Sequence, residues 1–88
     1  MNQVKLRYTV RTIHRWARGE TSYLDMAWSL GIGQDSLLKL LLDNFVCESD
    51  GQVADNITET EAVECILLAL ILHERHERLK PRKRYAKR

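Results

Sequence analysis

Basic side chains gather at both ends of this 88-residue chain, where they could pair with phosphate groups. Residues 1–18 carry +5 and residues 80–88 carry +6, whereas residues 19–72 hold ten acids and the single base Lys39. Such asymmetry predicts contacts with double-stranded DNA, although basic termini can also serve only solubility. The residues predicted to contact phosphate are Arg7, Arg11, Arg15, Arg18, Lys80, Arg82, Lys83, Arg84, Lys87 and Arg88.

Polar side chains that could read bases occur at the start of a predicted helix, at Gln34, Ser36 and Lys39. Amide, hydroxyl and ammonium groups are suited to the edges of base pairs in the major groove. The neighbouring Asp35 would repel phosphate, and Leu38 and Leu41 are expected on the face that would meet the groove. Two interpretations therefore stay open: the helix reads DNA, or it serves the core or a protein interface.

No residue pattern indicates catalysis, a metal or a cofactor. The sequence offers no nucleophile beside a base, no phosphate-binding glycine loop and no paired carboxylates. Cys47 and Cys65 are 18 positions apart without further ligands at metal spacing, so each is interpreted as a small buried hydrophobe. His73 and His76 are three residues apart on a predicted helix and are interpreted as a solvated helix end. We expect a protein that is not an enzyme.

The stretch 23–42 has the spacing of a helix-turn-helix. A small residue, Ala27, is followed four positions later by Gly31, and Leu37 and Leu40 follow six and nine positions beyond the glycine. Glycine permits the left-handed turn, and the apolar residues hold the second helix against the first. The pattern predicts a positive φ at Gly31.

Capping residues and helix stops predict an all-α domain of about four helices. The expected helices cover about residues 4–18, 22–30, 33–44 and 58–79, the last beginning at a capping box formed by Thr58 and Glu61. Residues 45–54 could form a small hairpin or a plain loop. A loose apolar stripe is expected on the first helix, made of Val4, Tyr8, Ile13, Trp16 and Ala17.

The last helix is apolar on every side, which predicts that it is buried on every side. Three short helices cannot surround it, so a second chain is expected to cover one face, giving a homodimer or a larger assembly. We assign residues 1–79 to this helix-turn-helix and oligomerisation domain, and 80–88 to a basic tail that orders on a partner. The predicted interface stripe is Val63, Ile66, Leu67, Leu70 and Ile71.

No segment predicts a membrane span or an export signal. The longest apolar run, residues 65–72, has eight residues, and residues 1–18 lack an apolar core segment. We therefore expect a cytoplasmic protein.

The stretch from Ala27 to Asp35, followed by a leucine-rich helix and by Asn44-Phe45-Val46-Cys47, resembles the D subunit of the flagellar master transcriptional activator (FlhD). The resemblance covers about residues 14–79, but this chain lacks one helix's worth of residues before Cys47. It implies an obligate complex with a larger, zinc-binding partner subunit that binds DNA jointly, with Cys47 near the dimer contact.

Together these features predict a DNA-binding transcription regulator, of the activator-subunit kind, that works in an oligomeric complex. The alternative is an adaptor, such as an anti-activator or assembly factor, whose helix-turn-helix packs against a protein.

Overall fold

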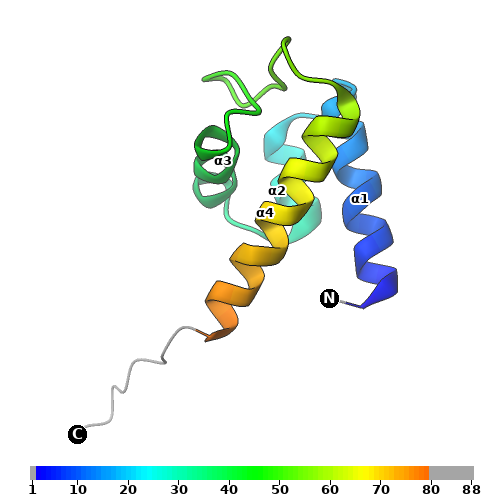
Figure 1. Ribbon diagram of the computed structural model, residues 1–88, viewed down its shortest axis with the longest axis vertical. Coiled ribbons are helices and arrows are strands. Elements are labelled where there is room, and N and C mark those ends of the chain that lie inside the picture. The colour runs from blue at the N-terminus through cyan, green and yellow to red at the C-terminus, as the bar shows by residue number, and fades with distance from the viewer. Residues whose placement is uncertain (1, 80–88) are drawn as a thin grey trace, which may run out of the picture.

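Four α-helices build the protein, as the computed structural model of the chain shows for residues 2–79, the part that it describes. They are α1 (Gln3–Ala17), α2 (Tyr23–Leu30), α3 (Gln34–Asp43) and α4 (Glu59–Leu79). The long α4 lies between α1 and α3, with α2 behind it (Figure 1). The predicted all-α class, the four helices and the long last helix are confirmed.

Two of the helices, α2 and α4, begin at side chains that cap them. The Ser22 hydroxyl accepts a 3.2 Å hydrogen bond from the amide of Asp25 at the start of α2. At α4, Thr58 Oγ1 accepts from the Glu61 amide at 3.1 Å, and Glu61 Oε1 accepts from the Thr58 amide at 2.9 Å. These bonds satisfy amides that have no partner within the helix. The cap of α1 was not predicted: the Asn2 side chain accepts a hydrogen bond from Lys5 N at 2.8 Å.

A tight left-handed turn joins α2 to α3. Gly31 has φ 69° and ψ 29°, so the predicted positive φ is confirmed. Its amide and that of Ile32 bond back to the last carbonyls of α2, which ends that helix. Ala27 and Leu37 are fully buried where the two helices meet.

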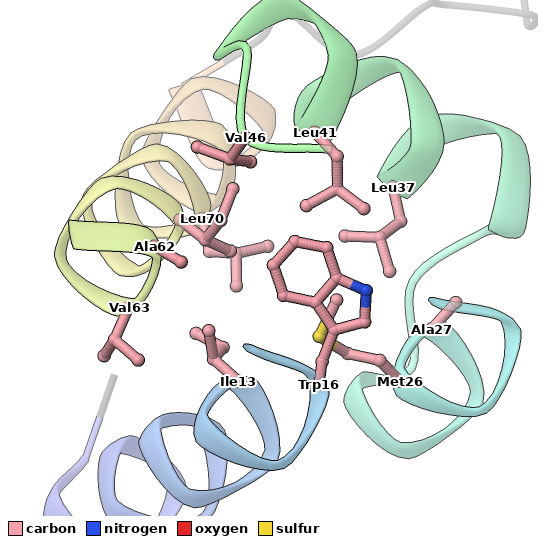
Figure 2. Packing of buried hydrophobic residues seen from close by; sticks show 11 residues of the cluster. Ile13, Trp16, Met26, Ala27, Leu37, Leu41, Val46, Ala62, Val63 and Leu70 are labelled. Atoms are coloured by element: carbon pink, nitrogen blue, oxygen red, sulfur yellow. The ribbon is translucent and has the colours of Figure 1, made fainter. Parts of the chain in front are cut away.

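The core forms around the indole of Trp16, which has no exposed surface. Figure 2 shows the ring between Met26 of α2 and the two leucines of α3, Leu37 and Leu41, with Ile13 beside it. Because Leu41 is fully buried, our expectation that it lies on the outer face of α3 was wrong. Leu37 and Leu41 lie one turn apart on the buried face of α3, and the other residues of the helix are partly or fully exposed.

The apolar stripe expected on the first helix is only half correct. Ile13 and Trp16 are fully buried, but Val4 is 78% and Tyr8 is 49% exposed. The polar residues Thr9 and Thr12 occupy the buried face instead. The Thr12 hydroxyl donates a 2.8 Å hydrogen bond to a backbone carbonyl of its own helix, which makes its burial tolerable.

Residues 45–54 form a minimal hairpin with a single antiparallel bridge, Cys47 to Val53, and no regular strand. Its end packs on the core, because Trp16 Nε1 donates a 2.9 Å hydrogen bond to the Gly51 carbonyl. The Tyr23 ring lies so close to Gly51 that an added Cβ would be 2.1 Å from its Cδ1. The hairpin is therefore held between α1 and α2.

Ionic contacts join α1 and α4 at both ends and show that the two helices are antiparallel. Lys5 Nζ lies 3.4 Å from Glu74 Oε2 at one end. At the other end, Glu59 contacts Arg18 at 3.1 Å and is hydrogen-bonded to Nδ1 of His14. Ile66 and Leu70 pack on the core between these contacts.

The stripe of α4 that we assigned to a partner chain belongs largely to the protein's own core. Val63, Ile66 and Leu70 are each at most 8% exposed, so they cannot meet a second chain, whereas Leu67 is half-buried and Ile71 is 39% exposed. The chain covers one side of α4 by itself because α1 lies along it. None of the helices in residues 2–79 combines the length and the apolar character that crossing a bilayer would need.

Candidate nucleic-acid interface

Three of the predicted arginines lie on one exposed face of α1, and Arg18, which caps the C-terminus of the helix, continues that face. Arg7, Arg11, Arg15 and Arg18 follow one another at steps of four, four and three residues, which keeps them on one side of a helix. The buried residues of α1 lie on the opposite side. We call these four residues the arginine face.

Only the N-terminal half of the arginine face keeps its charge free for a partner. Arg18 contacts Glu20 at 2.9 Å and Glu59 at 3.1 Å, and Arg15 lies 3.9 Å from Glu20. Arg7 and Arg11 have no ion-pair partner among residues 2–79. Two guanidinium groups one helical turn apart therefore offer their N–H donors to an outside anion.

An exposed tyrosine adds to this part of the surface. Val4, Arg7, Tyr8 and Arg11 line a shallow hollow on α1. The ring of Tyr8 can lie against a sugar or a base, and its hydroxyl can bond to a phosphate oxygen. Tyr8 was predicted to belong to the apolar stripe of the first helix, although its position three residues before Arg11 is also consistent with the arginine face.

The predicted base-reading residues are exposed on α3, but their surroundings are acidic and apolar. Gln34 and Ser36 lie in the first turn, and Lys39 is occupied by Asp43, with Nζ 3.1 Å from its Oδ2. Asp35 is exposed beside them. A duplex approaching this face would meet two carboxylates and one neutralised lysine.

The structure does not bring the two predicted DNA-binding regions together. The backbones of α1 and α3 are not neighbours: the two helices meet only through core side chains such as Trp16 and Leu37, and they lie on opposite sides of α4 (Figure 1). The buried side of α1 packs into the core to which α3 contributes Leu37 and Leu41, so the arginine face points away from α3. One straight duplex cannot lie along the arginine face and also enter at Gln34, Ser36 and Lys39.

The α2–α3 side of the molecule instead exposes large apolar side chains. Trp28 is 88% exposed on α2, and Leu42, near the end of α3, is 41% exposed. Phe45, directly after α3, is 84% exposed and has a positive φ of 59°, which is uncommon for a bulky residue. Aromatic residues are enriched at protein–protein interfaces, so exposed side chains of this kind favour a protein-binding surface. These residues were not predicted as a contact surface, because residue type alone does not show which apolar side chains are exposed.

The hairpin does not extend the basic surface. Glu48, Asp50 and Asp55 are exposed on or beside it. Carboxylates at these positions would repel phosphate, so the hairpin is unsuited to the role of a DNA-contacting wing. The predicted contacts of the basic tail, Lys80, Arg82, Lys83, Arg84, Lys87 and Arg88, lie outside the described residues.

The two cysteines pack partly buried against the core. Burial, followed by the charges of Asp50 and Glu48, raises the pKa of the Cys47 thiol. The thiol of Cys65 lies 3.7 Å from Asn44 Oδ1. Within residues 2–79, no three His, Cys, Asp or Glu side chains are grouped so that they could hold a metal ion.

Comparisons of the chain with known protein families, with curated proteins and with solved structures found no match. The resemblance to the D subunit of the flagellar activator rests on the quoted residues alone.

Proposed function

We propose that this protein is a subunit of an oligomeric transcription regulator that holds double-stranded DNA through the arginine face of α1. The observation that carries the proposal is the pair Arg7 and Arg11, exposed, unpaired within residues 2–79 and directed away from the core. Arginines in such a row contact phosphate and position a protein without reading sequence.

The α2–α3 surface then serves a protein partner of the complex. Trp28 on α2 and Phe45 directly after α3 supply exposed aromatic area, and Asp35 adds an exposed carboxylate on α3. Under this division the partner reads the bases. The arrangement agrees with the joint DNA binding that the resemblance to the flagellar D subunit implies.

Salt-dependent binding to a fluorescent duplex tests the proposal. The slope of log affinity against log salt changes by about 0.9 for each phosphate contact. Arg7→Gln with Arg11→Gln should therefore flatten the slope by about 1.8 and weaken binding to all duplexes alike. Lys39→Gln removes one charge from the opposite side and should leave slope and affinity unchanged.

A second pair of substitutions tests whether α3 reads bases. Gln34→Ala with Ser36→Ala should leave the preference for operator over random DNA unchanged. If the difference in binding free energy between operator and random DNA falls by about 1–3 kcal/mol for each lost base contact, α3 reads the bases after all.

The adaptor remains the second candidate function, favoured by the exposure of Trp28 and Phe45. No salt-dependent binding to any duplex, with the partner present or absent, would overturn the DNA-bound regulator and support the adaptor.

A further inference from the structure

The outer side of α4, away from the core, carries apolar residues that residues 2–79 cover only in part. Leu68 is 59%, Ile71 is 39% and Leu72 is 55% exposed, although all three lie in the middle of a helix whose other side is buried. Large side chains grouped in this way on a small domain mark a contact surface.

A regular spacing extends this surface along the helix. Glu61, Glu64, Leu68, Ile71, Arg75 and Arg78 follow one another at alternating steps of three and four residues, and we call them the outer stripe. Steps of three and four are the spacing of the seam at which two helices meet in a coiled coil. The stripe is acidic at its start, apolar at its centre and basic at its end.

We infer that two copies of this chain pair through their outer stripes, with the two α4 helices antiparallel. A two-fold axis that crosses α4 between Ala69 and Leu70 sets Leu68 opposite Ile71 of the second copy. The same axis sets Glu64 opposite Arg75, and Glu61 opposite Arg78. Each contact occurs twice, as a self-complementary interface requires.

The charges select this orientation. A parallel pair would place Glu64 beside Glu64 and Arg75 beside Arg75, and like charges held together across an interface are unfavourable. Neither Glu64 nor Arg75 has an ion-pair partner among residues 2–79 of its own chain. Their charges are therefore available to a second copy.

This pairing does not depend on DNA binding, and it uses a different side of the helix from the stripe at Val63, Ile66 and Leu70. It also leaves the arginine face free, because α1 packs against the buried side of α4.

Sedimentation velocity over a concentration series tests the pairing without DNA. The wild-type chain should shift from monomer to dimer as concentration rises. Leu68→Lys should abolish that shift while the helical circular dichroism and the melting temperature of the monomer stay unchanged, because Leu68 is outside the core. A wild-type chain that stays monomeric up to several hundred micromolar would overturn the inference, as would a Leu68→Lys chain that still dimerises.

Charge exchange tests the antiparallel orientation. Glu64→Arg alone and Arg75→Glu alone should each weaken the dimer, on the order of tenfold in Kd, because each turns two attractive pairs into repulsive ones. The double variant Glu64→Arg/Arg75→Glu should restore the wild-type Kd, since the exchanged charges again face opposite partners. In a parallel pair the double variant would still set like charges side by side. The single variants would likewise keep like charges together and would leave the Kd unchanged. An unchanged Kd in the single variants would therefore overturn the antiparallel orientation, as would a weakened dimer that the double variant does not restore.

Discussion

Trp16 Nε1 donates a 2.9 Å hydrogen bond to the carbonyl oxygen of Gly51, thirty-five residues further along the chain. This bond joins the centre of the core to the end of the hairpin, and both residues are buried. A buried carbonyl without a donor is costly, so the bond fixes where the hairpin must lie.

Trp16→Phe should lower the free energy of unfolding by about 1–3 kcal/mol, because the buried carbonyl of Gly51 loses its donor. The smaller phenylalanine ring should lower it further, because it fills less of the core. Urea denaturation measures the change. Trp28→Phe is the matched control, since Trp28 is 88% exposed and should change stability by less than about 0.5 kcal/mol. Equal losses in the two variants would contradict the packing described for Trp16.

Gly51→Ala should destabilise the protein far more than Gly31→Ala. Both glycines have positive φ, 83° and 69°, so each alanine is strained by about 1–2 kcal/mol. At Gly51 the new methyl group would also lie 2.1 Å from the Tyr23 ring, whereas at Gly31 nothing lies within 4 Å. Overpacking adds about 1–3 kcal/mol at Gly51 alone. Thermal unfolding of the two variants side by side gives the difference, and similar melting temperatures would show that Tyr23 moves aside freely.

Stability should fall in acid through Glu59. The hydrogen bond with His14, together with neighbouring Arg18, holds the pKa of Glu59 below its ordinary value near 4.5. A carboxyl group whose pKa is lower in the folded state stabilises the fold above its unfolded pKa. That contribution is lost as the pH falls below about 4.5 through the folded value.

Glu59→Gln should therefore flatten the dependence of unfolding free energy on pH in this acidic range. A double-mutant cycle with His14→Asn is the control. Glu59→Gln should change the pH dependence of the unfolding free energy less in the His14→Asn background than in the wild type. Urea titrations at a series of pH values provide both comparisons, and additive effects would mean that the two residues do not interact.

Cys47 should react slowly with iodoacetamide at neutral pH. The attacking species is the thiolate, and burial with Asp50 and Glu48 nearby raises the pKa of this thiol. In a Cys65→Ser background, Glu48→Gln should lower that pKa and speed the reaction. Mass spectrometry of the modified chain follows the rate, and alkylation as fast as that of a free cysteine would contradict the raised pKa.

Local signals in the sequence were sufficient to predict the helices. Ser22, Gly31 and the Thr58–Glu61 box each act within a turn of backbone, so their effect can be read from neighbouring residues. The core side of α4 could not be predicted, because leucines and isoleucines occupy all sides and only the packing of α1 decides which are buried.

The candidate site was predictable by residue type but not by arrangement. The arginines of α1 and the polar start of α3 are exposed as expected, yet no local pattern could show that they lie on opposite sides of α4. That separation is set by the tertiary packing of the helices. The hydrogen bond between Trp16 and Gly51 could not be predicted for the same reason, because it too depends on tertiary packing.

The antiparallel packing of α1 on α4 also determines when the protein can fold during synthesis. Ile13 and Trp16 leave the ribosome early, but Ile66 and Leu70, against which that part of the core closes, are made fifty or more residues later. Contacts so distant along the chain form slowly compared with local ones. A nascent chain that ends before residue 59 thus has Ile13 and Trp16 not yet covered on the α4 side of the core, and is a substrate for chaperones or for aggregation until α4 emerges.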